Sequence, residues 1–299
     1  RAPAGGRQIG QIIIGIALGL YFTPSVAREV ASYWHLLLAA ALFAILLGWA
    51  CGWFVARVTD ADRTTAFFAS VPGGAAEMTL LGEHFGARAD RVALAQSLRI
   101  LAVVIAVPFA LTYSGVQGAD TVRPVEVALD PAKLALLFAI AAATGGVLAL
   151  VRAPNAFMLG PLFATIALTA NEVQFSALPG ALVNAGQPLL GCALGSRFEQ
   201  QFLSRVPRYV AAILVSIGLA LVVAAAFGAT LAWLTGLSLP TLVLATAPGG
   251  VAEMCITAKV LQLGVPLVTA AHVTRVIVLV TATGPIFRLA RRIGRRAER

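Results

Sequence analysis

Long apolar runs alternate with short polar segments along most of the chain. Four of these runs approach or exceed the ~20 residues that a helix needs to cross a bilayer. They are Leu36–Val55, Leu134–Val151, Val210–Leu234 and Val265–Leu289. Because several occur in one chain, the pattern predicts an all-α, multi-pass membrane protein with about eight full spans. The predicted spans are residues 9–23, 34–56, 91–113, 132–151, 155–171, 181–203, 208–234 and 267–289.

Composition supports a membrane location. Only 12% of the residues are charged, whereas soluble proteins have about 25%. The net charge of +9 comes from 20 Arg and 2 Lys, and six Arg lie in the tail Arg288–Arg299. A basic segment directly after an apolar span is typical of a cytoplasmic end. We therefore expect a bacterial inner-membrane protein with a cytoplasmic C-terminus that binds no nucleic acid.

An internal repeat shapes the rest of the prediction. Ala69–Met78 and Ala245–Met254 match at seven of ten positions with an offset of 176, and Gly10–Phe22 matches Gly186–Phe198 at the same offset. A third match places Val92, Ala95 and Arg99 over Val268, Ala271 and Arg275. Shared Gln, Pro-Gly-Gly, Glu and Arg indicate duplication rather than similar apolar composition. We divide the chain into a first membrane repeat, residues 1–127, and a second, residues 128–299.

The repeats are expected to have opposite orientations. Alternating spans put Arg57–Arg63 inside but its partner Trp233–Leu239 outside, which is typical of an inverted-topology repeat. The Pro-Gly-Gly segments, residues 64–83 and 240–260, must then be re-entrant or broken helices. Residues Lys133–Pro179 have no counterpart in the first repeat, so we expect about two further N-terminal spans in the native protein.

Each Pro-Gly-Gly element offers a candidate binding site. Proline lacks an N–H and glycine tolerates unusual dihedral angles, so the chain can unwind and restart as a helix. The restarted helix presents free N–H groups and the positive end of its dipole. Glu77 and Glu253 fall in this first turn, where they either cap the helix or take part in function. The candidate residues are Pro72, Gly73, Gly74 and Glu77, with Pro248, Gly249, Gly250 and Glu253.

Two arginines in predicted spans need compensation. Arg99 and Arg275 lie deep in apolar runs, where an unpaired guanidinium costs several kcal/mol. We expect Glu from the neighbouring broken helix to pair with each, either as a structural lock or as part of an anion site. Three residues before each Arg, on the same helical face, are Gln96 and His272. His272 is a candidate proton carrier or a simple hydrogen-bonding residue.

The other repeated segment contributes Gln11 and Gln187, which are candidates to bind a ligand or the unwound backbone. Each is followed by two glycines four residues apart, Gly15 and Gly19 or Gly191 and Gly195. Such glycines let helices approach closely. Cys51, Cys192 and Cys255 show no metal-ligand or disulfide spacing, and we expect no metal and no cofactor.

With both Pro-Gly-Gly elements, the chain resembles the AbrB-type integral membrane family. That family has a duplicated membrane unit with a Pro-Gly-Gly-x-Ala-Glu-Met signature in each half, matched here by Pro72–Met78 and Pro248–Met254. The resemblance covers essentially the whole chain. Members carry labels such as regulator or ammonia-monooxygenase-like protein. The resemblance itself implies no substrate. Three scattered histidines do not build a copper site.

The residues favour a secondary transporter for a small, anionic solute, with proton coupling through Glu77 and Glu253 as a hypothesis. A membrane sensor acting through a partner protein is the alternative, and a channel the third. The chain lacks an ATP-binding motif and a nucleophile–base pair, so we do not expect an enzyme. The expected partners are a small-molecule solute and the lipid bilayer, and a homodimer would suit Gly/Ala-rich helix faces.

Overall fold

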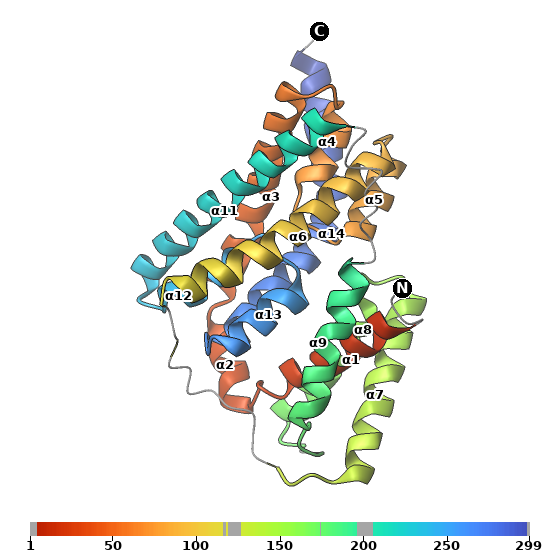
Figure 1. The fold of residues 1–299 in the computed structure, drawn as a ribbon, viewed down its shortest axis with the longest axis vertical. Coiled ribbons are helices and arrows are strands. Elements are labelled where there is room, and N and C mark those ends of the chain that lie inside the picture. The colour runs from red at the N-terminus through yellow and green to blue at the C-terminus, as the bar shows by residue number, and fades with distance from the viewer. Residues whose placement is uncertain (1–4, 116–117, 119–126, 174, 196–205, 298–299) are drawn as a thin grey trace.

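A computed structural model describes residues 5–115, 118, 127–173, 175–195 and 206–297 (Figure 1). All regular secondary structure in these residues is helical, which confirms the predicted all-α class. The helices are α1 (Gly6–Gly19), α2 (Pro24–Ser32), α3 (Trp34–Val58), α4 (Arg63–Ser70), α5 (Ala75–His84), α6 (Ala89–Tyr113), α7 (Pro131–Leu150), α8 (Ala156–Ala170), α9 (Gly180–Gly195), α11 (Pro207–Thr235), α12 (Leu239–Thr246), α13 (Val251–Val260) and α14 (Val265–Ala297).

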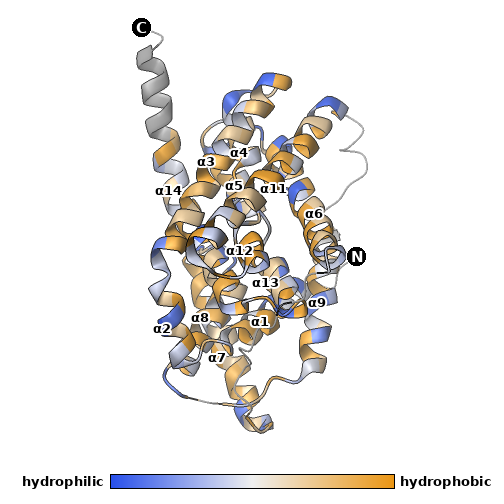
Figure 2. Ribbon diagram, turned by 90° about the vertical axis from the view of Figure 1, so that its left-hand side faces the viewer, coloured by the Kyte–Doolittle hydropathy of each residue, from blue (hydrophilic) through white to orange (hydrophobic). Residues whose placement is uncertain are grey.

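Five of the described helices are long and apolar enough to cross a membrane: α3, α6, α7, α11 and the part of α14 up to Phe287. Large apolar side chains on them are exposed, such as Trp49 and Trp53 at 56% each, as expected for residues that face lipid. Apolar residues line the long helices and hydrophilic residues gather near their ends (Figure 2).

Three predicted spans differ from the observed helices. The span 9–23 ends at Gly19, and the chain bends by 90° into α2. Thr23 caps α2 and Pro24 occupies its first turn, so a new helix begins where a loop was expected. The predicted span 155–171 is a helix of 15 residues. For the predicted span 181–203, α9 covers residues up to Gly195 and the rest lies outside the described residues.

Two groups of helices divide the molecule. The four-helix group consists of α1, α7, α8 and α9, which pack on one another. The broken-helix group consists of α3–α6 and α11–α14. The groups occupy different regions of the molecule (Figure 1). Both contain helices from before and after residue 127, so spatial neighbours do not follow the boundary between the sequence repeats.

The close packing of α1 depends on two glycines. A Cβ at Gly15 would lie 2.6 Å from the Met158 carbonyl oxygen, and a Cβ at Gly19 would lie 2.5 Å from Thr165 Cβ. The close approach of α1 to α8 therefore confirms the predicted role of this pair. At Gly191 a Cβ would meet nothing within 4 Å, so the prediction of close packing is wrong there.

Each Pro-Gly-Gly segment is a pair of short helices, α4 with α5 and α12 with α13. The bounds of α12 and α13 equal those of α4 and α5 plus 176 residues. Asp62 starts α4 by accepting a hydrogen bond from the Thr65 N–H (2.9 Å). The two interruptions, residues 71–74 and 247–250, are called the first and second break below.

Candidate functional site

Each break is a tight turn around its proline. The N–H of Gly73 donates to the carbonyl of Val71 over 2.8 Å, and the N–H of Gly249 donates to that of Ala247 over the same distance. This i to i+2 bond is the mark of a γ-turn. Because proline has no N–H to continue the helix, one short helix ends and the chain turns before the next begins.

Arg99 and Arg275 hold the breaks from neighbouring helices. Arg99 donates from Nη1 to the Val71 carbonyl (3.2 Å) and from Nη2 to that of Gly73 (2.8 Å). Arg275 binds the carbonyls of Ala247 and Gly249 in the same way. Val71 and Ala247 are the C-caps of α4 and α12, where carbonyls carry the negative end of the helix dipole. The guanidinium therefore gains favourable electrostatics there, and its second hydrogen bond to the carbonyl of Gly73 or Gly249 holds the turn.

The predicted ion pair between Arg99 and Glu77 is wrong. We predicted that Glu77 would compensate Arg99, but two main-chain carbonyls do so, and no ion pair joins these two residues in the described part of the chain. Both arginines are buried, with 5% of Arg99 and 4% of Arg275 exposed. Their Nε atoms have no hydrogen-bond partner.

Gln96 and His272 bind equivalent positions of the preceding short helices. Gln96 Nε2 donates to the Phe68 carbonyl (2.8 Å) and the Val71 carbonyl (2.9 Å). His272 Nε2 lies 3.0 Å from the carbonyl of Leu244, the residue 176 positions after Phe68. Since a carbonyl only accepts, Nε2 carries the proton. Both side chains are fully buried, so the contacts point to a structural role.

The two glycines of each break provide space rather than unusual dihedral angles. None of the four has a positive φ, so that part of our expectation is wrong. A Cβ at Gly73 would lie 2.6 Å from Met78 Cγ, and one at Gly74 would overlap the Glu77 carboxylate. Met254 and Glu253 restrict the second break equally, at Gly249 and Gly250. Within each Pro-Gly-Gly-x-Ala-Glu-Met signature, the two glycines thus leave room for the Glu and Met side chains of the same signature.

One cavity brings both breaks together. Its volume is about 90 Å³, enough for several waters or a small solute. It lies between the two helix groups, because α1, α8 and α9 supply one side and the breaks, α6 and α14 the other. Its polar and break residues are Arg7, Gln11, Pro72, Gly73, Gly74, Glu77, Arg99, Asn155, Gly249, Gly250, Glu253 and Arg275.

Most predicted site residues therefore line one cavity, and four do not. Gln96 and His272 contact the ends of the short helices and do not line the cavity. Pro248 lines a smaller space of about 20 Å³ together with Pro72 and Arg99. Gln187 lines a separate apolar pocket that also reaches Glu253. Arg7 also lines the cavity, although its sequence position predicted no binding role, since a basic residue before the first apolar run is typical of a topology signal. No cluster of potential metal ligands occurs among the described residues.

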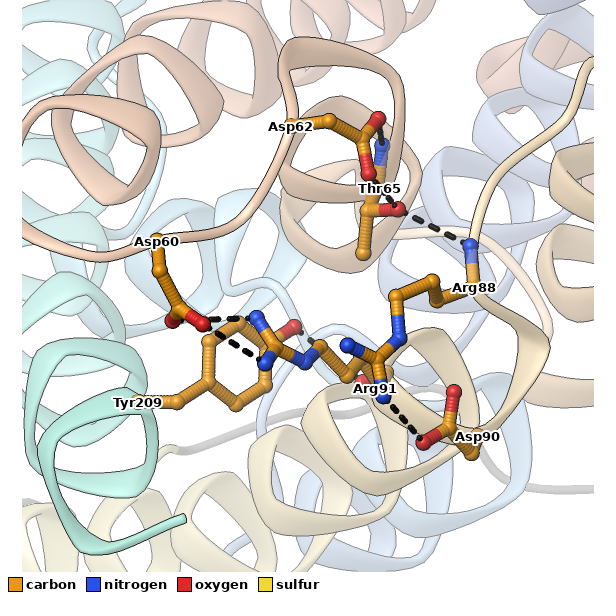
Figure 3. Close-up of polar contacts among 7 residues, drawn as sticks. All are labelled: Asp60, Asp62, Thr65, Arg88, Asp90, Arg91 and Tyr209. Atoms are coloured by element: carbon orange, nitrogen blue, oxygen red, sulfur yellow. Dashed lines mark hydrogen bonds and ion pairs between the residues drawn. The ribbon is translucent and has the colours of Figure 1, made fainter.

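A second polar cluster surrounds Arg91 (Figure 3). Arg91 donates to both carboxylate oxygens of Asp60, at 3.1 and 2.9 Å, and its guanidinium carbon lies 5.4 Å from the centre of the Tyr209 ring. The hydrogen bond from Arg91 holds the pKa of the Asp60 carboxyl below its ordinary value. Tyr209 returns a hydrogen bond to the Arg91 carbonyl (3.1 Å). The cluster joins the α3–α4 loop, α6 and α11.

The fold and the cavity define a helical membrane-type protein with two equivalent interrupted helices around one polar site. The family model for "Transition state regulatory protein AbrB" matches residues 1–291. The chain therefore belongs to the AbrB family.

Two curated relatives cover most of the chain. An uncharacterized protein of Bacillus subtilis, YhjN, is 30% identical over 94% of this chain and 77% of its own length. The "Putative regulator AbrB" of Escherichia coli is 29% identical over 95% of this chain and 82% of its own length. No solved structure matches.

Proposed function

We propose that the protein is a secondary transporter for a small, anionic solute, which binds between the two breaks near the middle of the membrane. One observation carries this proposal: both breaks and their arginine and glutamate residues line a single cavity. Broken helices whose ends face a central site are typical of secondary transporters. Three guanidinium groups and two carboxylates line it, which gives one excess positive charge.

The same proposal includes an inverted-topology repeat in the bacterial inner membrane, with a cytoplasmic C-terminus. The matching helix bounds support the duplication. The α3–α4 end and the C-terminus lie towards one end of the molecule, whereas α12 lies about halfway along it, at the opposite end of α11 (Figure 1), which supports opposite orientations. Residues proposed to be internal also meet in space, since Arg208 Nε donates to the Val58 carbonyl at 3.0 Å.

Proton coupling would act through Glu77 and Glu253. Both carboxylates line the cavity, and neutralising either one would change the charge available to an anion. The test is uptake of isotope-labelled organic acids, amino acids and inorganic anions into proteoliposomes, at several external pH values. We expect saturable, pH-dependent uptake of one class, and Glu77→Gln with Glu253→Gln should abolish the pH dependence. Protein-free liposomes supply the background.

A membrane sensor is the second candidate function, because the matched family model and one relative carry regulatory names. A sensor would bind the solute without moving it across the membrane. Saturable binding with uptake equal to that of empty liposomes would therefore overturn the transporter proposal. Deleting Arg291–Arg299 should then abolish signalling, whereas uptake by a transporter should survive. Uptake that never saturates would indicate a channel.

A further inference from the structure

The glutamates of the two breaks adopt one unusual arrangement in both halves. Glu77 is the third residue of α5 and folds back over Gly74, the residue before the helix. Glu253 folds back over Gly250 at the start of α13 in the same way. Each carboxylate occupies the space that a Cβ would otherwise fill. The helix starts thus already hold a negatively charged group.

The backbone conformation does not explain why these positions are glycine. Gly74 has φ −67° and ψ 138°, and Gly250 has φ −78° and ψ 156°, which are angles that any residue adopts. Glycine is needed here because the carboxylate lies where a side chain would begin. The pattern Gly-x-x-Glu therefore encodes a small anion position at each helix start, where N–H groups and the helix dipole favour negative charge.

A second observation indicates that these positions take a ligand. Arg99 and Arg275 line the same cavity, are more than nine-tenths buried, and each keep an Nε atom without a hydrogen-bond partner. The other charged groups that line this cavity are Arg7 from α1, Arg99 from α6 and Arg275 from α14. Three guanidinium groups against two carboxylates leave one excess positive charge in the cavity, which favours an anion.

We propose that the substrate class is a small monocarboxylate and that Glu77 and Glu253 are tethered competitors for its site. In the empty cavity, each side-chain carboxylate occupies the helix start. The solute carboxylate takes one of these positions, and the displaced glutamate moves aside and binds a proton from the medium. One proton would thus accompany one carboxylate. This inference rests on the proposed function for the movement of the solute across the membrane, but the competition itself is a property of binding.

The experiment uses acetate as the probe, because it is the free analogue of the end of a glutamate side chain. Acetate binding is measured by calorimetry on the purified full chain in nanodiscs of neutral lipid at pH 7.5, with acetamide as the uncharged control. A tethered group acts at an effective concentration of the order of millimolar. We therefore expect Glu77→Gln to tighten acetate binding by about tenfold or more.

Gly74→Ala should have the opposite effect, because its Cβ fills the position that both carboxylates need. We expect acetate binding to weaken by at least about tenfold and to stay weak in the double variant with Glu77→Gln. Gly82→Ala is the matched control: it adds a Cβ to the same short helix, 3.2 Å from Phe68 Cβ and outside the cavity, and should leave the acetate affinity within about twofold. Glu83→Gln removes an exposed charge from α5 outside the cavity and should change nothing.

The outcomes separate the two proposals. Acetate affinity that is unchanged or weaker in Glu77→Gln, or unchanged in Gly74→Ala, with an intact circular-dichroism spectrum, would overturn the competition. Equal binding of acetamide would overturn the anion site. If the variants behave as expected but no solute enters proteoliposomes, the competition stands and the transporter proposal fails.

Discussion

At the scale of single residues, each signature position has a spatial partner. Gly73 makes room for Met78 and Gly74 for Glu77, while Pro72 ends the first short helix. The sequence made the glutamates and arginines visible as candidates because charges are rare in apolar runs. It could not reveal that Arg99 binds backbone carbonyls, since every residue has a carbonyl and only the folded turn shows which ones lie within reach of the guanidinium. The obvious carboxylate partner was therefore the wrong one.

Arg275→Lys tests the role of the guanidinium. A lysine ammonium is a single point charge and cannot span the carbonyls of Ala247 and Gly249 as the planar guanidinium does. Losing one buried, charged hydrogen bond costs about 1.5–3 kcal/mol, so we expect a clearly lower melting temperature in detergent. Arg28→Lys is the control, because exposed Arg28 also donates to a carbonyl, that of Pro24 (3.1 Å). An equal effect of both changes would argue against the proposed role.

At the scale of helices, apolar runs predicted where the long spans lie, and the breaks followed from Pro-Gly-Gly. The shorter elements were harder to predict. Polar residues of α2 resembled a loop, although Thr23 and Pro24 are typical of a helix start. The spacing in Gly15–Gly19 and Gly191–Gly195 is identical, but a Cβ would meet a neighbouring helix at Gly15 and Gly19 and nothing within 4 Å at Gly191. Spacing shows that close approach is possible, and only tertiary structure shows whether a partner is present.

Gly15→Ala and Gly146→Ala separate packing from helix propensity. Alanine favours a helix by up to about 1 kcal/mol over glycine, and at Gly146 its Cβ meets nothing within 4 Å. We expect Gly146→Ala to keep or raise the melting temperature. Gly15→Ala places its Cβ against the Met158 carbonyl and must push α1 from α8, so we expect a loss of about 1–3 kcal/mol. Equal melting temperatures would contradict the tight α1–α8 contact.

At the scale of the whole molecule, the cavity lies where the four-helix group meets the broken-helix group. The sequence repeat predicted equivalent chemistry in the two halves, and the equivalent contacts of Arg99 and Arg275 agree with it. It did not predict the grouping of α1 with α7, α8 and α9, because the order of repeats along a chain does not determine which helices pack together. If the repeats are inverted, equivalent positions in the two halves lie on opposite sides of the membrane.

Arg63 and Leu239 begin α4 and α12, are separated by the repeat offset of 176, and are both exposed. If the halves have opposite orientations, these positions lie on opposite sides of the membrane. We therefore expect a membrane-impermeant maleimide to label Leu239→Cys in intact cells and Arg63→Cys only after lysis. The background must lack native cysteines, since Cys192 is exposed. Labelling of both positions from outside would contradict the inverted repeat, because parallel halves place equivalent residues on one side.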